Sequence, residues 1–180
     1  MQRRCNGFTL IEAVISLVVV GILLAVAVPA WSSVLARSHA ASARAALLAS
    51  LSTAISHAAI TGTEVVLCPS SSTECANSWD WSSGWIAYAD IDGDRRHDAG
   101  ETLLHHQAAL ADDIRLLTSK GRKRLVFQPN GGNAGSNVTF TMCVGRGAGN
   151  AATLVLANSG RLRGGKPSRK AALLCAASRL

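Results

Sequence analysis

The residue types that could perform chemistry are few, and their spacing does not suit catalysis. A nucleophilic site needs a Ser or Cys, a base, and a group that orients the base. His39 and His57 lie far apart along a predicted helix, and His105 and His106 are neighbours in a predicted strand, where adjacent side chains face opposite sides. The sequence contains no H-E-x-x-H, G-x-S-x-G or G-x-x-x-x-G-K-[ST] motif. We therefore expect neither an enzyme nor a cofactor.

An acidic segment, residues 90–101, has the spacing of a calcium-binding loop. Carboxylates stand at positions 1, 3, 5, 9 and 12 of these twelve residues. However, the glycine usual at position six is Arg95, and Arg96 and His97 add positive charge. Strands rather than helices are predicted on both sides. We therefore favour an acidic hairpin turn, with no bound metal, over a calcium-stabilised adhesin tip.

Basic and acidic residues are unevenly distributed along the chain. The 180 residues include 18 Lys or Arg and 11 Asp or Glu, which gives a net charge of +7. Ten of the eleven acids lie within residues 64–113, whereas residues 114–180 contain twelve Lys or Arg and no acid. This segregation indicates a polyanionic partner, either nucleic acid or an anionic surface.

Two basic clusters carry most of this charge, one in a predicted turn and one in a Gly-flanked tail that we expect to be a flexible loop. Cations without acidic neighbours suit phosphate contacts, and the tail has no interleaved aromatic residue for stacking on single strands. We therefore expect double-stranded DNA as the partner, and the alternative is a solvated basic tail. The candidate residues are Lys120, Arg122, Lys123, Arg124, Arg161, Arg163, Lys166, Arg169 and Lys170.

The elements that position these residues begin with a long helix. Residues 13–31 carry no charge and are long enough to span a membrane, which needs about 20 residues. Apolar residues then recur at helical spacing, with Arg37 and Arg44 on the other side. They are Leu47, Leu48, Leu51, Ala54, Ile55, Ala58 and Ala59. We expect one helix over residues 8–60, kinked rather than broken at Pro29 and ended near Gly62.

A β-rich head is predicted after the helix. Strands are expected at residues 64–68, 84–90, 102–107, 114–118, 124–128, 137–144 and 153–157, separated by Gly- and Asn-containing turns. Alternation of Val138, Phe140 and Met142 with polar residues predicts a half-buried antiparallel strand. Aromatic residues are few, so the core should consist mostly of Val, Leu, Ile and Ala. The expected fold class is α+β, with a long N-terminal α-helix packed on a small antiparallel β-sheet.

Five cysteines are present, and four remain if the first few residues are removed. An even number suits two disulfides formed in an oxidising compartment. Although four cysteines allow three pairings, the simplest joins Cys68 to Cys75 and Cys143 to Cys175. The second bridge would hold the tail against a central strand.

The segment Gly7-Phe8-Thr-Leu-Ile-Glu12 resembles the class III signal of type IV pilins and type II secretion pseudopilins. The resemblance implies cleavage by prepilin peptidase after Gly7, methylation of the Phe8 amine, and Glu12 as the assembly residue. A carboxylate at the edge of an apolar segment is costly, which fits a functional role. The implied organisation is a leader (1–7), a membrane or pilus-core helix (8–31), an amphipathic helix (32–62) and a head (63–180) with a basic tail from about residue 158. The chain would lie in the inner membrane, with its head in the periplasm, and then join other pilins in a cell-surface pilus.

Motifs further along the chain, in their order, resemble the GspH/FimT group of pilins. They are Ala43-Arg44, Val65–Cys68, Gly84-Trp85-Ile86, Asp90-x-Asp92-Gly-Asp94, Gly100-Glu101 and Phe127–Gly131. Gly160-Arg-Leu-Arg163 also resembles the GRxR element of FimT-type minor pilins, which bind DNA for natural transformation. The resemblance implies that Arg161 and Arg163 contact DNA, with Lys166, Arg169 and Lys170 as helpers. We predict a DNA-binding minor pilin; the alternative is a purely structural minor pilin, or a type II secretion pseudopilin, that primes filament assembly.

Overall fold

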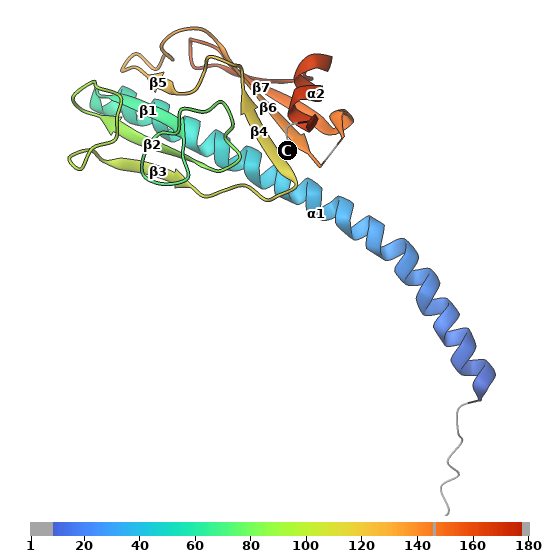
Figure 1. The fold of residues 1–180 in the computed structure, drawn as a ribbon. Coiled ribbons are helices and arrows are strands. Elements are labelled where there is room, and N and C mark those ends of the chain that lie inside the picture. Colours follow the sequence, from blue (N-terminus) through green and yellow to red (C-terminus); the bar gives the residue numbers. More distant parts are fainter. Residues whose placement is uncertain (1–8, 146, 178–180) are drawn as a thin grey trace, which may run out of the picture. The chain divides into compact units, whose positions relative to one another are not determined.

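The computed structural model describes residues 9–145 and 147–177, apart from the side chains of Pro29 and Ala30 (Figure 1). Contacts divide the chain into two compact units that meet between Leu35 and Ala36. We call the second unit the head. Helix α1, Leu10–Thr61, belongs to both units. It continues through Pro29, so the prediction of one unbroken long helix is confirmed.

The first unit is an apolar stretch of α1. Its large side chains between Leu10 and Val28 are exposed, and the helix is long and apolar enough to cross a membrane. The helix begins with a side-chain cap, because the Glu12 N–H donates to Thr9 Oγ1 at 3.3 Å. The predicted processing residues Gly7 and Phe8 lie outside the described residues.

In the head, α1 buries one side, as its 3.6-residue period predicts. Leu47, Leu51, Ala54 and Ala58 are at most 1% exposed. Leu48 and Ile55 are half-buried, whereas Ala59 is exposed, contrary to expectation, because it lies beside the buried stripe rather than in it. The helix ends where Gly62 adopts φ 74° and donates its N–H to the Ala58 carbonyl at 3.0 Å.

Two four-stranded antiparallel sheets follow, where one small sheet was expected. The first has the order β3-β2-β1-β5 and the second β4-β6-β7-β8. The seven predicted strands are all present, within two residues at each end. Their bounds are β1 Glu64–Pro69, β2 Trp85–Asp90, β3 Leu103–Gln107, β4 Ile114–Thr118, β5 Leu125–Phe127, β6 Val138–Val144 and β7 Ala151–Leu156.

The basic tail is folded, and the expectation of a flexible loop is wrong. It forms strand β8, Leu162–Gly165, and helix α2, Arg169–Ala177, which packs on β4 and β6 (Figure 1). A short 3-10 helix, η1, Ala148–Asn150, precedes β7. The tail is ordered because Leu162 packs on the core and because Ala172 and Cys175 of α2 are buried.

The main core lies between α1 and both sheets, and its centre is aromatic. Trp81 and Trp85 have ring centroids 6.3 Å apart, and Trp81 meets Phe140 edge to face at 5.4 Å. Trp85 Nε1 donates to Ser50 Oγ of α1 at 2.8 Å, which satisfies both buried polar groups. Most of the buried side chains around these rings are Leu, Val and Ala, so the expectation of a mainly aliphatic core is confirmed.

Two disulfides join Cys68 to Cys75 and Cys143 to Cys175, the pairings that the sequence favoured. The second attaches α2 to β6. Strand β6 is therefore covered on both faces: Phe140 faces the main core, and Cys143 packs with Cys175 and Leu117 on the other side. The alternating pattern of this strand predicted a solvent-exposed face, which α2 covers instead.

Candidate functional site

The turn after β4 separates the residues of the first basic cluster. Lys120 extends over Trp79, with its Nζ 5.9 Å from the ring centroid, a distance suited to a cation–π contact. Lys123 is exposed. Arg122 and Arg124 point to other partners, so residues 120–124 do not form one continuous patch.

Arg122 is half-buried and bound to the neighbouring loop. Its Nη2 donates to Asn133 Oδ1 at 3.1 Å and to the Ala134 carbonyl at 3.0 Å. Burial lowers the pKa of Arg122 from its usual value. These bonds occupy the guanidinium edge that a phosphate would use, so Arg122 joins the loop before β6 to the turn after β4.

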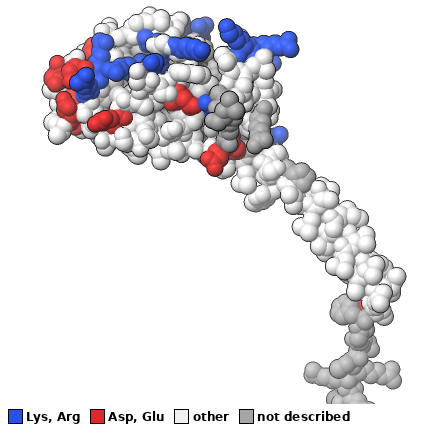
Figure 2. Space-filling view, in the orientation of Figure 1, with Lys and Arg blue, Asp and Glu red and all other residues white. Residues whose placement is uncertain are grey.

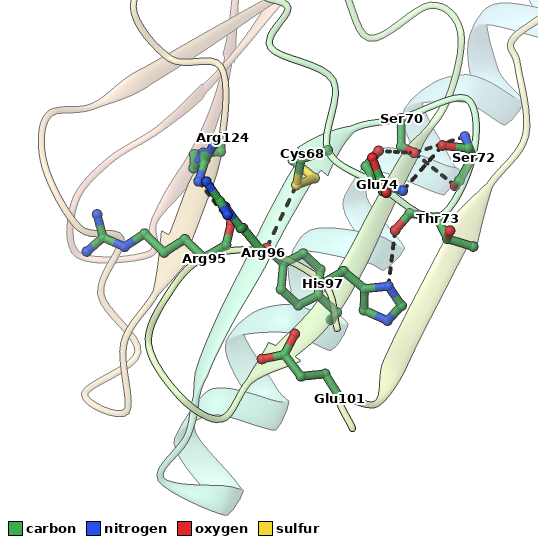
Figure 3. Close-up of a disulfide and its surroundings, with 12 residues drawn as sticks. Cys68, Ser70, Ser72, Thr73, Glu74, Arg95, Arg96, His97, Glu101 and Arg124 are labelled. Carbon is green, nitrogen blue, oxygen red and sulfur yellow. Dashed lines mark hydrogen bonds between the residues drawn. A yellow bond between two sulfur atoms is a disulfide. The ribbon is translucent and has the colours of Figure 1, made fainter. Parts of the chain in front are cut away.

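Arg124 reaches the acidic loop, residues 91–102 between β2 and β3. Its Nη1 donates to the Arg95 carbonyl at 2.9 Å, and Figure 3 shows the two residues side by side near the Cys68–Cys75 bridge. Arg124 is exposed, and its charge acts on Tyr88 together with those of Asp90, Glu101 and Asp94. Its side-chain hydrogen bond is thus to the acidic loop.

Arg161 and Arg163 share one face, because side chains two residues apart in an extended segment point to the same side. Leu162 between them pairs with Leu156 and packs on the core, whereas both arginines are exposed. The preceding turn requires glycine: Gly160 has φ 77°, and a Cβ there would lie 2.9 Å from the Gly131 carbonyl oxygen. The Gly-Arg-Leu-Arg motif thus combines a turn, two outward cations and one inward anchor.

Helix α2 presents a further basic pair at its start. Arg169 and Lys170 are exposed in its first turn, and the Ser168 hydroxyl accepts from the Ala171 N–H at 3.3 Å. Because Cys175 is bonded to β6, these cations are held on the head rather than on a free tail. Lys166 is exposed on the connection between β8 and α2.

A groove of about 360 Å³ brings the two sequence clusters together. Lys120 from the first cluster and Lys170 from the second both line it, and Trp79 and Leu174 supply apolar walls. Trp79 comes from the loop before β2, so it was missed in the sequence, where no aromatic residue accompanies the tail. Its half-buried position beside the lysine could be recognised only from the fold.

Charge is segregated on the surface as well as along the chain. Figure 2 shows Lys and Arg along one edge of the head, with Asp and Glu at one end and on the opposite side. In the part of the chain that the structure describes, none of the nine candidate cations has a carboxylate within ion-pair distance. The exposed cations among these nine are therefore not neutralised by a carboxylate of the described residues.

Two of the histidines, His39 and His97, join separate segments of the head. His39 Nδ1 lies 2.9 Å from Asp113 Oδ1 and joins α1 to the start of β4. His97 meets the Thr73 carbonyl, and His105, whose pKa is lowered by burial and by His106, lies on β3. The partners of His39 and His97 come from separate places in the head.

Comparison with known proteins supports this architecture. The model of the family described as type II transport protein GspH matches residues 43–160, more than half of the chain. The model of the prokaryotic N-terminal methylation motif matches residues 2–28. None of the curated proteins matches.

Solved structures of similar fold include two crystal forms of the type IV minor pilin FimU from Pseudomonas aeruginosa. One has 18% identity and a TM-score of 0.58 over 74% of this chain and 92% of that chain. The other has 16% identity and a TM-score of 0.51, over 68% and 87%. The minor pseudopilin EpsH from the type 2 secretion system of Vibrio cholerae has 13% identity and a TM-score of 0.46, over 68% and 98%.

These findings also fit the N-terminal segment. A methylation motif ahead of an apolar helix implies prepilin peptidase processing, membrane anchoring and association with other pilins, and the family is structural rather than catalytic. With the GspH match over the head and the pilin fold of α1 and its sheets, the chain belongs to the GspH family of minor type IV pilins and pseudopilins.

Proposed function

We propose that this chain is a minor type IV pilin whose head binds double-stranded DNA non-specifically during natural transformation. The observation that carries the proposal is the outward pair Arg161 and Arg163, whose backbone is fixed by the Gly160 turn and by the half-buried Leu162. Neither arginine has a carboxylate partner in the described part of the chain. Two exposed guanidinium groups on one face, with no carboxylate partner among the described residues, suit adjacent phosphates.

Lys120, Lys123, Lys166, Arg169 and Lys170 are also exposed and would add to the contact. Lysine side chains act as charges that neutralise phosphate and release counterions without reading sequence. Arg122 and Arg124 are not part of the proposed contact surface, because their guanidinium groups bind the Ala134 and Arg95 carbonyls. The mechanism is electrostatic attachment, and filament retraction, implied by the family resemblance, would draw the DNA inward.

Assembly in this proposal follows the N-terminal segment. Prepilin peptidase cleaves after Gly7, the Phe8 amine is methylated, and the Glu12 carboxylate pairs with the amine of a neighbouring subunit. Glu12 is exposed in the first turn of α1, as such a contact requires. Before assembly the helix lies in the inner membrane with the head in the periplasm, and afterwards the head is displayed on the pilus.

The test is the salt dependence of DNA binding. The full chain, in non-ionic detergent with its disulfides oxidised, is titrated into a labelled short duplex and followed by fluorescence anisotropy. Each phosphate contact contributes about 0.9 to the slope of log affinity against log salt, so the double variant Arg161→Ala/Arg163→Ala should reduce the slope by about 1.8. Between about 50 and 200 mM salt, the affinity loss would then be about tenfold smaller than in the original chain.

A matched control is Arg37→Ala/Arg96→Ala, which removes the same charge from two exposed arginines elsewhere. It should leave the slope almost unchanged. If both double variants have the same effect, binding reflects net charge alone and the site is wrong. If no binding occurs at low salt, the alternative is supported: a structural minor pilin, or a pseudopilin as the GspH match also allows, that primes assembly without DNA.

A further inference from the structure

The acidic loop between β2 and β3 is not used by the proposed DNA surface. With Asp90 at the end of β2, residues 90–101 contain five carboxylates and two arginines, a net charge of −3 with His97 neutral. The spacing alone favours a hairpin turn. One buried carboxylate in the structure instead favours a cation site in this loop.

Asp90 is only 3% exposed, and its two oxygens differ. Oδ1 accepts from the Gly93 N–H at 3.1 Å and from the Arg95 N–H at 3.3 Å. Oδ2 is buried and has no hydrogen-bond partner among the described residues. A buried carboxylate oxygen without a partner is unfavourable, because it loses its hydration without replacement. Such an oxygen needs a ligand, and a cation is the ligand that a carboxylate prefers.

Two further carboxylates stand close to Asp90. One side-chain oxygen from each of Asp90, Asp92 and Asp94 lies within 4.8 Å of the other two. Oxygens that share one calcium ion at 2.3–2.6 Å can be no more than about 5.2 Å apart, so this triangle fits a single ion. Asp92 and Asp94 are exposed, which leaves a path from solvent and room for water ligands.

The loop already holds the conformation that such a site uses. Arg95, at the position usually taken by glycine, has φ 62°, the only positive φ recorded among the described non-glycine residues. Glu101 accepts from the Ile91 N–H at 2.9 Å and from the Asp98 N–H at 3.2 Å, which closes the loop. Figure 3 shows Arg95, Arg96, His97 and Glu101 along this loop, with Cys68 nearby. The backbone of the loop is therefore held closed before an ion binds.

We propose that Asp90, Asp92 and Asp94 form a calcium site at the end of the head, independent of DNA binding. Calcium fits better than magnesium, because three carboxylates on one irregular loop suit its flexible coordination, whereas magnesium demands near-octahedral geometry. Since Arg95 and Arg96 oppose the carboxylate charge, the affinity belongs to the weak class of extracellular calcium modules, with a Kd of about 10⁻⁴–10⁻³ M.

The probe is calcium chloride, titrated calorimetrically into the chelator-treated full chain in non-ionic detergent. We expect one saturable site per chain and a rise in melting temperature with calcium, with weaker binding of magnesium. Asp94→Asn should weaken calcium binding about tenfold or more, because it removes one of three anionic ligands. The control Asp112→Asn, which removes an exposed carboxylate before β4, should bind as the original chain does.

A variant that improves the site makes the test sharper. Arg95→Gly keeps the N–H that binds Asp90, removes a positive charge, and suits the left-handed backbone, so calcium should bind several-fold more tightly. The proposal is overturned if about 10 mM calcium gives neither saturable heat nor a change in melting temperature. It is also overturned if Asp94→Asn binds like Asp112→Asn, or if magnesium binds as tightly as calcium.

Discussion

The two disulfides should differ in how much they stabilise the head, and the difference follows from sequence separation. Cys143 and Cys175 are 32 residues apart, and Cys68 and Cys75 are 7 apart. In the chain-entropy model, a crosslink lowers the entropy of the unfolded chain by an amount that grows with the logarithm of the closed loop. The long bridge should then contribute about 3.7 kcal/mol and the short one about 2.4 kcal/mol.

The perturbation is a pair of double variants in the full chain, Cys143→Ala/Cys175→Ala and Cys68→Ala/Cys75→Ala. Urea unfolding in non-ionic detergent can be followed by tryptophan fluorescence, because Trp81 and Trp85 are fully buried in the head. We expect the first variant to lose about 1.3 kcal/mol more free energy of unfolding than the second.

Loss of the long bridge has a second expected consequence. Helix α2 would be held on β6 only by Ala172 and the alanine that replaces Cys175, so Lys170 would no longer stay opposite Lys120 across the groove. The reasoning is refuted if removing the long bridge costs no more than removing the short one. Equal losses would mean that native packing around each bridge, rather than loop closure, sets the stabilisation.

Two further predictions concern the backbone and pH. Gly160→Ala should destabilise the head by about 1–2 kcal/mol in urea unfolding, because the backbone there is left-handed and a Cβ would meet the Gly131 carbonyl. The control is Gly149→Ala, whose Cβ would meet nothing within 4 Å. It should change the free energy of unfolding by less than about 0.5 kcal/mol. Burial and then the charge of His106 lower the pKa of His105 below 6.5, so the unfolded chain binds the proton more readily. Stability should therefore fall as pH decreases through about 6.5, and His105→Gln should make that fall smaller; an unchanged pH dependence would show that His105 does not contribute.

Much of the fold could be predicted from local patterns. The helical period of Leu47, Leu51 and Ala54 marks the buried side of α1, and Gly62 marks its end. Strand positions followed from apolar runs between turns, because side chains in a strand alternate and turns need glycine or asparagine. Burial of both faces of β6 could not be predicted this way, since helix α2 comes from residues about thirty positions further along.

Part of the candidate site could likewise be predicted from the sequence, and part of it depends on the fold. The excess of cations after residue 114 and the Gly-Arg-Leu-Arg motif are properties of the chain itself, and the outward direction of Arg161 and Arg163 follows from strand geometry. Lys120 and Lys170 are fifty residues apart, and only the packing of α2 on β4 and β6 brings them to one groove beside Trp79.

The sequence by itself determined the long helix, the first seven strands, the charge segregation and the spacing of the acidic loop, because each depends on residues that are close along the chain. The tertiary structure decided which cations are free and which are occupied. Lys120–Arg124 reads as one cluster, yet Arg122 points to the loop before β6 and Arg124 to the carbonyl of Arg95. It also left one buried oxygen of Asp90 without a partner. Hydrogen-bond partners and burial depend on segments that meet only after folding, so no local pattern could have shown either result.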